Sequence, residues 1–523
     1  MSSPAGFARA HDAGLGTSYG NTLDPSEGPN DVDVQRSIDE ALEHLEGGRA
    51  YDGLFTLEQA FAELRCRQFR RMERFAGRDD QAHAEVKKVV AATKRTADRL
   101  QGDPAALERC GQLLFEAGAT TAACSVFERV VQLAPTRASA HYNHGIALRS
   151  RNAPSAALSA FDRCLRRVPD WAAAHNYRSL CLRQLDRPHE ARDALDTALG
   201  YKPYDAQARF NRGLIELYLG NLQAGWSDHE ARWLTPAFQG AALDSDIPAW
   251  SGEQVAGRHL LLWAEQGLGD TIQFVRFARR LADRGATVTL RVQPSLVRLL
   301  ASVTGAYAVQ GTDNQPATAD AHAPLHSVPH LLGLREPDLH EAVPYLAAEP
   351  ALIEAWRGAL STDKTNIGVI WRGGPSAEGS THRSFSAEAL WPLAHVDGVT
   401  LIALQKERAP DALVDQDAPP MVDVGEDLDE GPDAFVDTAA LMTQLDLVVT
   451  CDTATAHLAG ALGCPVWLAL PWTPDWRWQR RRADSPWYPT MRLFRPTAPG
   501  DWDGVMRDMA RRLASDVLGS EAN

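Results

Sequence analysis

One short segment near the carboxyl end of the chain combines the residue types that bind phosphate groups. The apolar run 445–450 predicts a buried strand, the residues from Asp452 to Thr455 a polar turn, and the small residues that follow a helix ending at Gly463. A second apolar run, 466–470, completes a strand–helix–strand unit. Helix starts attract anions, and open parallel sheets bind ligands at the carboxyl ends of their strands. We interpret this turn as the binding site for the diphosphate of a nucleotide-sugar.

The individual side chains of this turn suit that interpretation. Asp452 supplies an acceptor, Thr453 and Thr455 supply hydroxyl groups, and His457 supplies a titratable ring one turn into the helix, with Ala454 at the helix start. For His457 the alternative is a packed or capping histidine, which needs no ligand. We expect all five residues to contact the donor.

Polar side chains at other predicted strand ends can neutralise phosphate charge. Arg372 follows a predicted strand at 366–371, and Gln405 and Lys406 end another at 399–405. Arginine offers a bidentate fork that lysine lacks, and either cation stabilises a departing diphosphate. We therefore expect Arg372, Gln405 and Lys406 to contribute to donor binding.

A glycine turn at 267–270 follows an earlier predicted strand at 259–265. Glycine allows a ligand close to the backbone, so Gly269 is a candidate donor contact, and Asp270 lies at a helix start. Asp270 is either an N-terminal cap or a general base that deprotonates the acceptor. His322, His326 and His330 lie nearby without a carboxylate or cysteine at ligand spacing, so we expect no metal site.

The composition excludes several classes of protein. The 523 residues are too many for one core, and 44% hydrophobic with 23% charged residues is typical of globular chains. A net charge of −15 and no Lys/Arg run besides 480–482 argue against nucleic-acid binding. Seven cysteines without a CxxC pair indicate reduced thiols and a cytoplasmic location. We find no apolar segment typical of a signal peptide or a membrane span.

Residues 103–236 repeat with a period of 34. Small residues recur at Gly111, Gly145, Ser179 and Gly213, and prolines recur at 135, 169 and 203. This period predicts tetratricopeptide (TPR) helical hairpins, in which small residues allow close helix packing. The last unit gains aromatic residues at 226 and 233, which suits a cap against the following domain. Before the repeats we expect a disordered tail at 1–32 and a helical region at 33–102.

An asparagine recurs on the first helix of three repeats, at Asn143, Asn176 and Asn211. Residues that face inward on this helix line the groove of a TPR array. We expect these amides to bind the backbone of an extended acceptor peptide; the alternative is an ordinary polar helix position.

The remainder of the chain predicts two Rossmann-like domains, at 237–350 and 351–523. Strands are expected at 259–265, 287–292 and 307–310, with a short one before His322, and then at 366–371, 399–405, 445–450 and 466–470. A further short strand is expected within the acidic stretch 411–433, Asp437 is expected to cap a helix, and a terminal helix is expected at 502–517. The predicted class is multidomain: an all-α TPR superhelix followed by α/β domains of the GT-B type.

Two segments carry a resemblance to known enzymes. Residues 263–274, WAEQGLGDTIQF, and 452–459, DTATAHLA, resemble bacterial TPR-fused glycosyltransferases, whose catalytic half is similar to glycosyltransferase family 9, the heptosyltransferases. Residues 471–478 and 484–489 match the same group. The resemblance implies that Asp270 is the catalytic base and that Asp452, Thr453 and His457 belong to the donor-phosphate segment. Ala454 departs from the glycine usual there, which narrows the approach to phosphate.

The same layout resembles the protein O-GlcNAc transferases and flagellin-modifying glycosyltransferases. It implies a metal-independent enzyme with no cofactor, which takes a nucleotide-sugar as co-substrate and a protein acceptor such as flagellin Ser or Thr in the TPR groove. Two alternatives stay open: a lipopolysaccharide or other glycan transferase, and a TPR adaptor with a non-catalytic GT-B half. The sequence identifies neither the donor sugar nor the stereochemical outcome.

Overall fold

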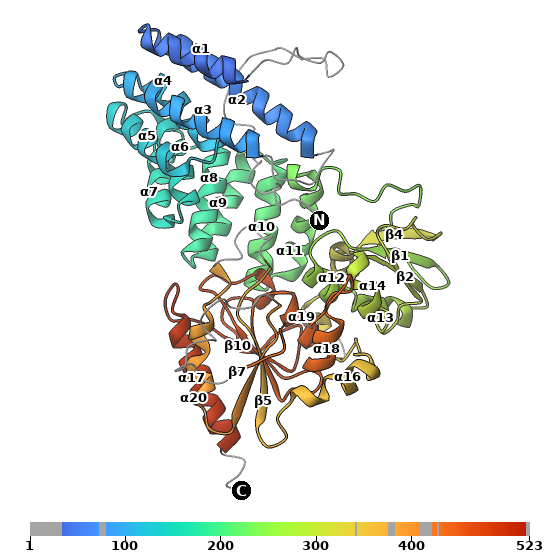
Figure 1. The fold of residues 1–523 in the computed structure, drawn as a ribbon. Coiled ribbons are helices and arrows are strands. Elements are labelled where there is room, and N and C mark those ends of the chain that lie inside the picture. The colour runs from blue at the N-terminus through green and yellow to red at the C-terminus, as the bar shows by residue number, and fades with distance from the viewer. Residues whose placement is uncertain are drawn as a thin grey trace. The chain divides into compact units, whose positions relative to one another are not determined.

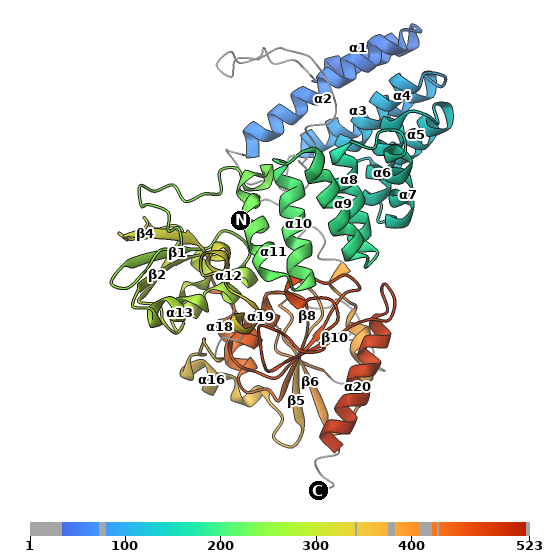
Figure 2. The ribbon, with the colours of Figure 1, turned by 180° about the vertical axis from the view of Figure 1, so that it is seen from behind.

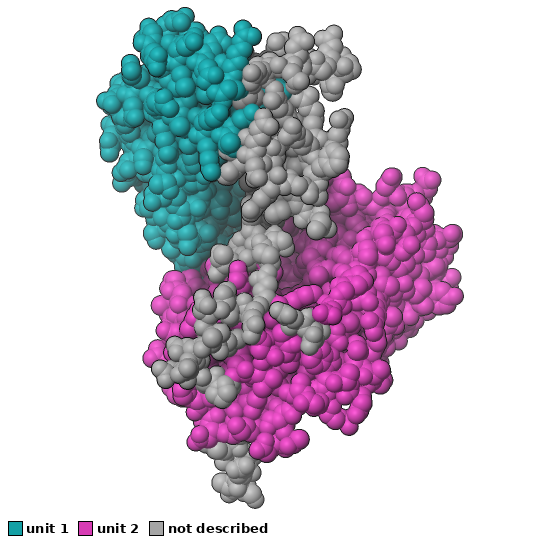
Figure 3. All heavy atoms as spheres, in the orientation of Figure 1, with its two compact units in different colours: residues 1–2, 11–208 teal, residues 3–10, 209–523 magenta. Residues whose placement is uncertain are grey.

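The computed structural model describes residues 34–72, 80–339, 343–374, 382–406, 421–425 and 428–518. The described residues divide into two compact units, shown in different colours in Figure 3. The first ends at Ala208 and the second begins at Arg209, within helix α10 (Ala206–Leu219). This division falls before the predicted domain boundary at residue 236. The predicted disordered tail, 1–32, lies outside the described residues.

The first unit is helical throughout its described part (Figure 1). Three helices occupy the predicted region 33–102 and confirm its helical character. Paired helices with the predicted 34-residue period follow, because α4, α6, α8 and α10 begin at 104, 138, 172 and 206. The helices are α1 (Val34–Glu46), α2 (Ala50–Met72), α3 (Asp80–Arg99), α4 (Pro104–Glu116), α5 (Thr120–Leu133), α6 (Ala138–Ser150), α7 (Pro154–Leu165), α8 (Ala172–Gln184) and α9 (Pro188–Tyr201).

Close packing within each helix pair requires the recurrent small residue. A Cβ placed on Gly111 would lie 2.5 Å from the Phe127 ring, and one on Gly145 would lie 2.8 Å from the Phe161 ring. The repeats also share a contact that the sequence analysis did not anticipate: a ring nitrogen of His141 lies 2.8 Å from the Pro135 carbonyl oxygen, and His175 contacts Pro169 at the same distance. The turn between repeats is thus tied to the following helix.

We predict that Gly145→Ala lowers stability, although alanine favours helix more than glycine. Phe161 is fully buried and has no room to move, so overpacking costs about 1–3 kcal/mol and outweighs a helix gain of about 1 kcal/mol. Gly200 in α9 is the matched control, because a Cβ placed on it would meet no other atom within 4 Å. Gly200→Ala should leave stability equal or higher. Urea unfolding measures both, and equal effects would contradict the packing argument.

The second unit starts with the end of the repeats and includes α11 (Leu222–His229), η1 (Glu230–Leu234) and η2 (Pro236–Phe238). Trp226 is buried, and its ring lies 5.3 Å from that of Trp476 and 6.5 Å from that of Trp487. These aromatic contacts confirm the prediction that the last repeat caps the following domain. The hairpin therefore shares a hydrophobic core with the α/β part.

Two parallel sheets form the α/β part. The first lobe holds β1 (His259–Trp263), β2 (Thr287–Val292), β3 (Ala308–Gly311) and β4 (Ala321–Pro324) in the order β3-β2-β1-β4. Strands β1, β2 and β3 match the predicted ones within one or two residues, whereas β4 includes His322 and the two residues after it, where the strand was expected to end before His322. The helices of this lobe are α12 (Leu268–Phe274), α13 (Phe277–Asp283), η3 (Pro294–Leu296), α14 (Val297–Leu300), η4 (Leu325–Ser327), α15 (Val328–Leu331) and η5 (Glu336–Leu339).

The second lobe holds six parallel strands in the order β10-β9-β8-β5-β6-β7. Alternate residues of each strand face opposite helix layers, with α17 and α20 on one side and α18 and α19 on the other (Figures 1 and 2). Strand β10 was not predicted. The elements are α16 (Pro350–Trp356), η6 (Arg357–Ala359), β5 (Thr365–Ile370), η8 (Ala387–Leu390), α17 (Trp391–Ala394), β6 (Val399–Ala403), β7 (Met421–Asp423), α18 (Val436–Met442), β8 (Leu447–Cys451), α19 (Ala454–Ala461), β9 (Val466–Ala469), η10 (Trp476–Trp478), β10 (Met491–Phe494) and α20 (Trp502–Leu518).

The two sheets share one topology. In each, the first strand along the chain lies between the second and the fourth, so the strand order reverses at the pairs β1/β4 and β5/β8. Such a reversal leaves a crevice at the carboxyl ends of the two strands, where α/β folds bind ligands. The predicted TPR-like repeats and two Rossmann-like lobes are confirmed by this element order.

The prediction that Asp437 caps a helix is wrong. Helix α18 begins after Phe435, whose φ of 67° is left-handed, and Asp437 lies inside the helix. The Asp429 carboxylate supplies the cap, because it accepts the backbone N–H groups of Asp437 at 2.8 Å and Thr438 at 3.3 Å. A residue from the preceding loop replaces the local cap that the sequence suggested.

Candidate active site

The candidate residues gather at the two strand-order reversals of the second unit. In the first lobe, Asp270 follows β1 and His326 follows β4. In the second lobe, Arg372 follows β5 and Asp452 follows β8. Four segments far apart in the sequence therefore end at the two edges where ligand crevices form.

Asp270 occupies the third position of α12 and has two roles at once. Its Oδ2 accepts the backbone N–H of Gly267 at 3.0 Å, which is the capping alternative considered from the sequence. Its Oδ1 lies 2.5 Å from Arg477 Nη2, and the side chain stays 24% exposed. Burial alone would raise the pKa of Asp270, but Arg477 and His326 outweigh it and lower the pKa. The carboxylate is therefore ionised at neutral pH and open to a ligand.

Arg477 joins the two lobes. It belongs to η10 of the second lobe, and it donates to Asp270, to Gln273 Oε1 at 2.5 Å and to Asp475 Oδ1 at 2.8 Å. Its side chain is nearly buried, and its charge also acts on Asp452. Arg477 was not among the predicted site residues, although its segment carried the family resemblance. No local pattern signals its pairing, because 207 residues separate it from Asp270.

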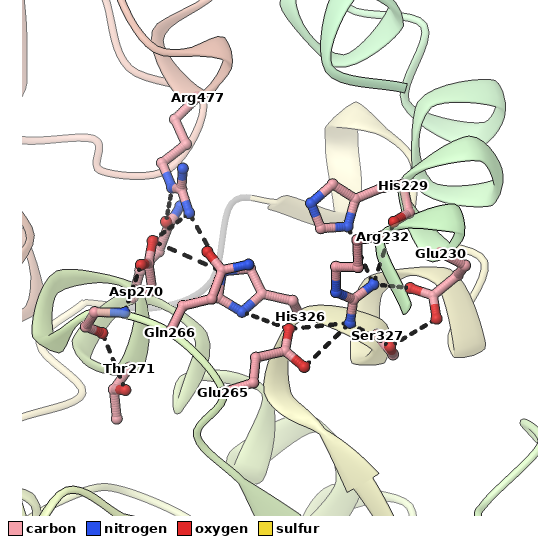
Figure 4. A network of polar contacts seen from close by, with 12 residues as sticks. His229, Glu230, Arg232, Glu265, Gln266, Asp270, Thr271, His326, Ser327 and Arg477 are labelled. Atoms are coloured by element: carbon pink, nitrogen blue, oxygen red, sulfur yellow. Dashed lines mark hydrogen bonds and ion pairs between the residues drawn. The ribbon is translucent and has the colours of Figure 1, made fainter. Parts of the chain in front are cut away.

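Behind Asp270, a row of buried charges crosses the first lobe (Figure 4). His326 lies between the carboxylates of Asp270 and Glu265. Glu265 in turn pairs with Arg232, at 2.9 Å. Sequence reasoning treated His326 only as one of three neighbouring histidines and did not single out Glu265 or Arg232. The only local signal was the position of Glu265 at the end of the predicted strand 259–265.

The starts of α12 and α19 are in contact. A Cβ on Gly269 would lie 3.0 Å from Ala454 Cα and 3.2 Å from His457 Cδ2. This helix contact leaves little space for a side chain at position 269, and the expected donor contact of Gly269 stays a prediction. Ala454 faces the same contact. The helix start predicted to bind phosphate is therefore next to Asp270.

His457 has the environment of a packed histidine. Its Nδ1 lies 3.0 Å from the Tyr488 hydroxyl, and its ring stacks on Trp478 at 5.4 Å. Burial, with the nearby Arg477 charge, lowers the pKa of His457 to about 3. The ring is neutral at neutral pH, so it supplies no positive charge to a phosphate, contrary to its expected use as a titratable group. The neutral ring can still contact a nucleotide-sugar by donating an N–H.

Four of the predicted donor contacts, Arg372, Gln405, Thr453 and Thr455, come together at adjacent strand ends. The backbone N–H of Arg372 donates to Gln405 Oε1 at 3.2 Å, and a Cβ on Gly373 would lie 3.1 Å from Thr453 Cγ2. The hydroxyls of Thr453 and Thr455 are 2.7 Å apart. The Lys406 side chain contacts a different segment, because its Nζ donates to the Asp429 carbonyl oxygen at 2.8 Å.

Asp452 is a buried carboxylate at the end of β8. It is 3% exposed, and its Oδ2 has no hydrogen-bond partner among the described residues. Burial and the neighbouring Asp475 raise the pKa of Asp452 to about 6. Ionising the Asp452 carboxylate in this buried place therefore lowers the stability of the folded protein.

This pKa predicts the pH dependence of a variant. The pKa of Asp452 in the folded protein lies above its ordinary 3.8, so its contribution to stability is complete below pH 4 and is lost as the pH rises through about 6. Asp452→Asn removes that loss. We compare the free energy of unfolding of the variant with that of the parent. Between pH 4 and pH 7.5 this difference should shift in favour of the variant by about 1–3 kcal/mol. Urea unfolding at both pH values measures this, and a pH-independent difference would contradict it.

The asparagines predicted to bind an acceptor are buried. Asn143 is 5% exposed, and its Nδ2 donates to Glu108 Oε1 at 2.8 Å. Asn176 and Asn211 are each 8% exposed. A buried amide with an internal partner does not offer its groups to a peptide, so the structure supports the alternative of internal polar positions.

Among the described residues, no cluster of three or more His, Cys, Asp or Glu side chains has the arrangement of a metal site. In the same part of the chain, no helix is both long and apolar enough to cross a membrane.

No protein-family model matches the chain. It is 28% identical over 340 residues to Protein FlbA of Caulobacter vibrioides, which covers 59% of this chain and 55% of that protein. The chain thus spans about half the length of the curated relative it matches.

Similar solved structures fall into two groups. A family 9 glycosyl transferase from Veillonella parvula is 11% identical and covers 52% of this chain and all of its own, with a TM-score of 0.38. The protein MamA is 19% identical, covers 32% of this chain and 99% of its own, and has a TM-score of 0.27. YrrB, described as a TPR protein with an unusual peptide-binding site, is 16% identical, with a TM-score of 0.26 and coverages of 32% and 93%. At these scores, the fold assignment rests on the helix repeats and sheet order described above.

Proposed function

We propose that the chain is a metal-independent glycosyltransferase that moves a sugar from a nucleotide-sugar to a hydroxyl group of a protein. The observation that carries the proposal is the pairing of Asp270, at the strand-order reversal of the first lobe, with Arg477 of the second lobe. The α12–α19 contact brings the helix start after β8 next to the same carboxylate. Two ligand-binding edges of parallel sheets therefore share one site, as a two-substrate reaction requires.

In this reaction, the acceptor oxygen forms a bond with the anomeric carbon while the bond from that carbon to the diphosphate breaks. The electron pair of the broken bond leaves on the diphosphate, and the hydroxyl proton passes to Asp270. Because the pKa of Asp270 is lowered, it is a weak base that takes the proton late, when bond formation has made the hydroxyl acidic. Arg477, Arg372 and the N–H groups at the start of α19 are the groups that would stabilise the leaving diphosphate.

We further propose that the acceptor is a protein held by the helical repeats, in the cytoplasm, with flagellin Ser or Thr as the first candidate. Helical repeats of this kind present extended surfaces to partner chains. The flagellin candidate derives from the resemblance of two sequence segments to TPR-fused transferases. The flagellin candidate does not depend on the buried asparagines, so other residues of the repeats would contact the acceptor.

A donor screen tests the proposal. Thermal unfolding of the full chain is followed with UDP-, GDP-, ADP- and CMP-sugars, because a ligand specific for the folded state raises the unfolding temperature. We expect one nucleotide-sugar class to raise it with saturation, and Arg372→Ala to weaken that effect. Arg357→Ala, which removes an exposed pair with Glu354, is the control and should leave the effect unchanged. No stabilisation by any nucleotide-sugar would contradict the proposal.

One observation favours a second candidate, the non-catalytic adaptor. The ion pair with Arg477 that lowers the pKa of Asp270 also weakens it as a base. Nucleotide release with donor and flagellin separates the two candidates, since an adaptor binds without turnover. The intact mass of flagellin with and without the gene separates protein transfer from transfer to a glycan, and an unchanged mass would count against flagellin.

A further inference from the structure

A chain of buried charges behind Asp270 plays no part in the transfer steps above. His326 Nδ1 lies 2.9 Å from Glu265 Oε1, and its Nε2 lies 3.7 Å from Asp270 Oδ1. Arg232 Nη2 lies 2.9 Å from the same Glu265 oxygen, and the side chains of Arg232 and Glu265 are fully buried. Arg232 also pairs with Glu230 at 2.7 Å and donates to Ser327 at 2.8 Å (Figure 4).

We infer that His326 is a positioning residue for Asp270, held in place by Glu265 and, through Glu265, by Arg232 of the last helical hairpin. The inference rests on the proposed function, because it assigns the orientation of the proposed base to this chain of contacts. It also makes the end of the helical repeats a part of the active site. Removing charge from any member changes the surroundings of Asp270 without touching the substrate.

Because His326 lies between two carboxylates, its protonation state determines whether it can donate to one of them or to both. An imidazole offers an N–H to both sides only when both nitrogens are protonated. Burial alone would lower the pKa of His326, but the Asp270 and Glu265 carboxylates outweigh it and raise the pKa. As the pH rises above that pKa, the ring loses one of its two N–H groups, and the contact of His326 with either Asp270 or Glu265 loses its donor, while Arg477 and Arg232 stay paired with these carboxylates.

Among the other neighbours of His326, Arg477 is a cation that opposes protonation of the ring, and His229 is a second titratable group. Arg477 Nη2 lies 3.4 Å from His326 Nε2 and shares Asp270 with it. The His229 ring stacks at 6.1 Å, and burial together with Arg232 lowers the pKa of His229, so that ring is neutral. Phe274 covers another side of the ring at 4.4 Å. The two carboxylates are therefore the anions that stabilise the protonated form.

A kinetic experiment on the full chain tests the inference. His326→Gln should lower kcat by about 10- to 100-fold and leave the donor KM within about twofold, because a misplaced base slows the chemical step without weakening donor binding. The parent should lose kcat as the pH rises through the His326 pKa, and the variant should not show this loss. His330→Gln, an exposed neighbour, is the control and should behave as the parent. A parent-like kcat and pH profile in His326→Gln would overturn the inference.

A titration independent of turnover separates this inference from the proposed function. In histidine-labelled full chain, the ring NMR signal absent from His326→Gln should titrate above the ordinary 6.5, and Glu265→Gln should lower that pKa by about one pH unit. A His326 pKa below 6.5, or one that Glu265→Gln leaves unchanged, overturns the inference even in an active transferase. The expected titration in a chain without transferase activity supports the coupling and contradicts the proposed function alone.

Discussion

Asp270→Asn is expected to lower kcat of sugar transfer by about 10²- to 10⁴-fold, the usual contribution of a general base. Asparagine preserves the size of the side chain and the acceptor for the Gly267 N–H, but it cannot take a proton. Donor binding should change little, because the residue faces the acceptor side in the proposed reaction. Steady-state nucleotide release with the donor identified by the screen measures the effect, and thermal shift measures donor binding.

Asp283→Asn is the matched control. Asp283 ends α13 in the same lobe, and its side chain is 72% exposed. The control should retain the parent kcat. If Asp270→Asn keeps more than about a tenth of the parent rate while it remains folded, Asp270 is not the base and the adaptor or another base must be considered.

Arg276→Met is expected to cause a large loss of stability, about 3 kcal/mol or more. Arg276 is 1% exposed and lies between α12 and α13, where Nη1 donates to the Trp487 carbonyl at 2.8 Å and Nη2 to the Tyr345 hydroxyl at 3.0 Å. Its guanidinium also lies 4.4 Å from the centre of the Tyr488 ring. Methionine fills a similar volume but leaves these buried acceptors without a donor and removes the cation–π contact.

The effect should appear in urea unfolding as a lower midpoint. Arg279→Met provides the comparison, since Arg279 lies one turn away with a side chain 43% exposed and 3.9 Å from Asp283. That exposed pair is worth little, so the control should change stability by less than about 0.5 kcal/mol. Similar midpoints for the two variants would show that the buried contacts of Arg276 between the lobes do not stabilise the protein.

Arg276 and Arg477 show how the two lobes are joined. Arg276 of the first lobe donates to the Trp487 carbonyl, and Arg477 of the second lobe donates to Asp270 and Gln273. Both arginines are nearly or fully buried and have several partners. Such planar, multiply bonded cations give a defined orientation, which a site shared by two lobes requires.

Much of the fold was predictable because its signals are local. The 34-residue period predicted the helix pairs, and the apolar runs predicted nearly all of the described strands, since periodicity and Gly/Pro punctuation act over a few residues. Asp270, Asp452 and Thr453 were found for the same reason, as polar residues just after such runs. Their positions at strand ends follow from the sequence alone, whereas their catalytic and binding roles remain predictions.

The tertiary structure decided which charges meet. Asp270 contacts Arg477, which is 207 residues away in the sequence, and Glu265 contacts Arg232, which is 33 residues away. Glu265 also contacts His326, which follows the neighbouring strand β4. Gly269 and Ala454 touch because two helix starts pack together, and Asn143 is buried where it donates to Glu108 of the preceding helix pair. Sequence spacing carries no information on these pairings, because they depend on strand order and on which faces of separate elements pack together. A local pattern establishes where a side chain lies along its element, and only packing determines its partner and therefore its pKa.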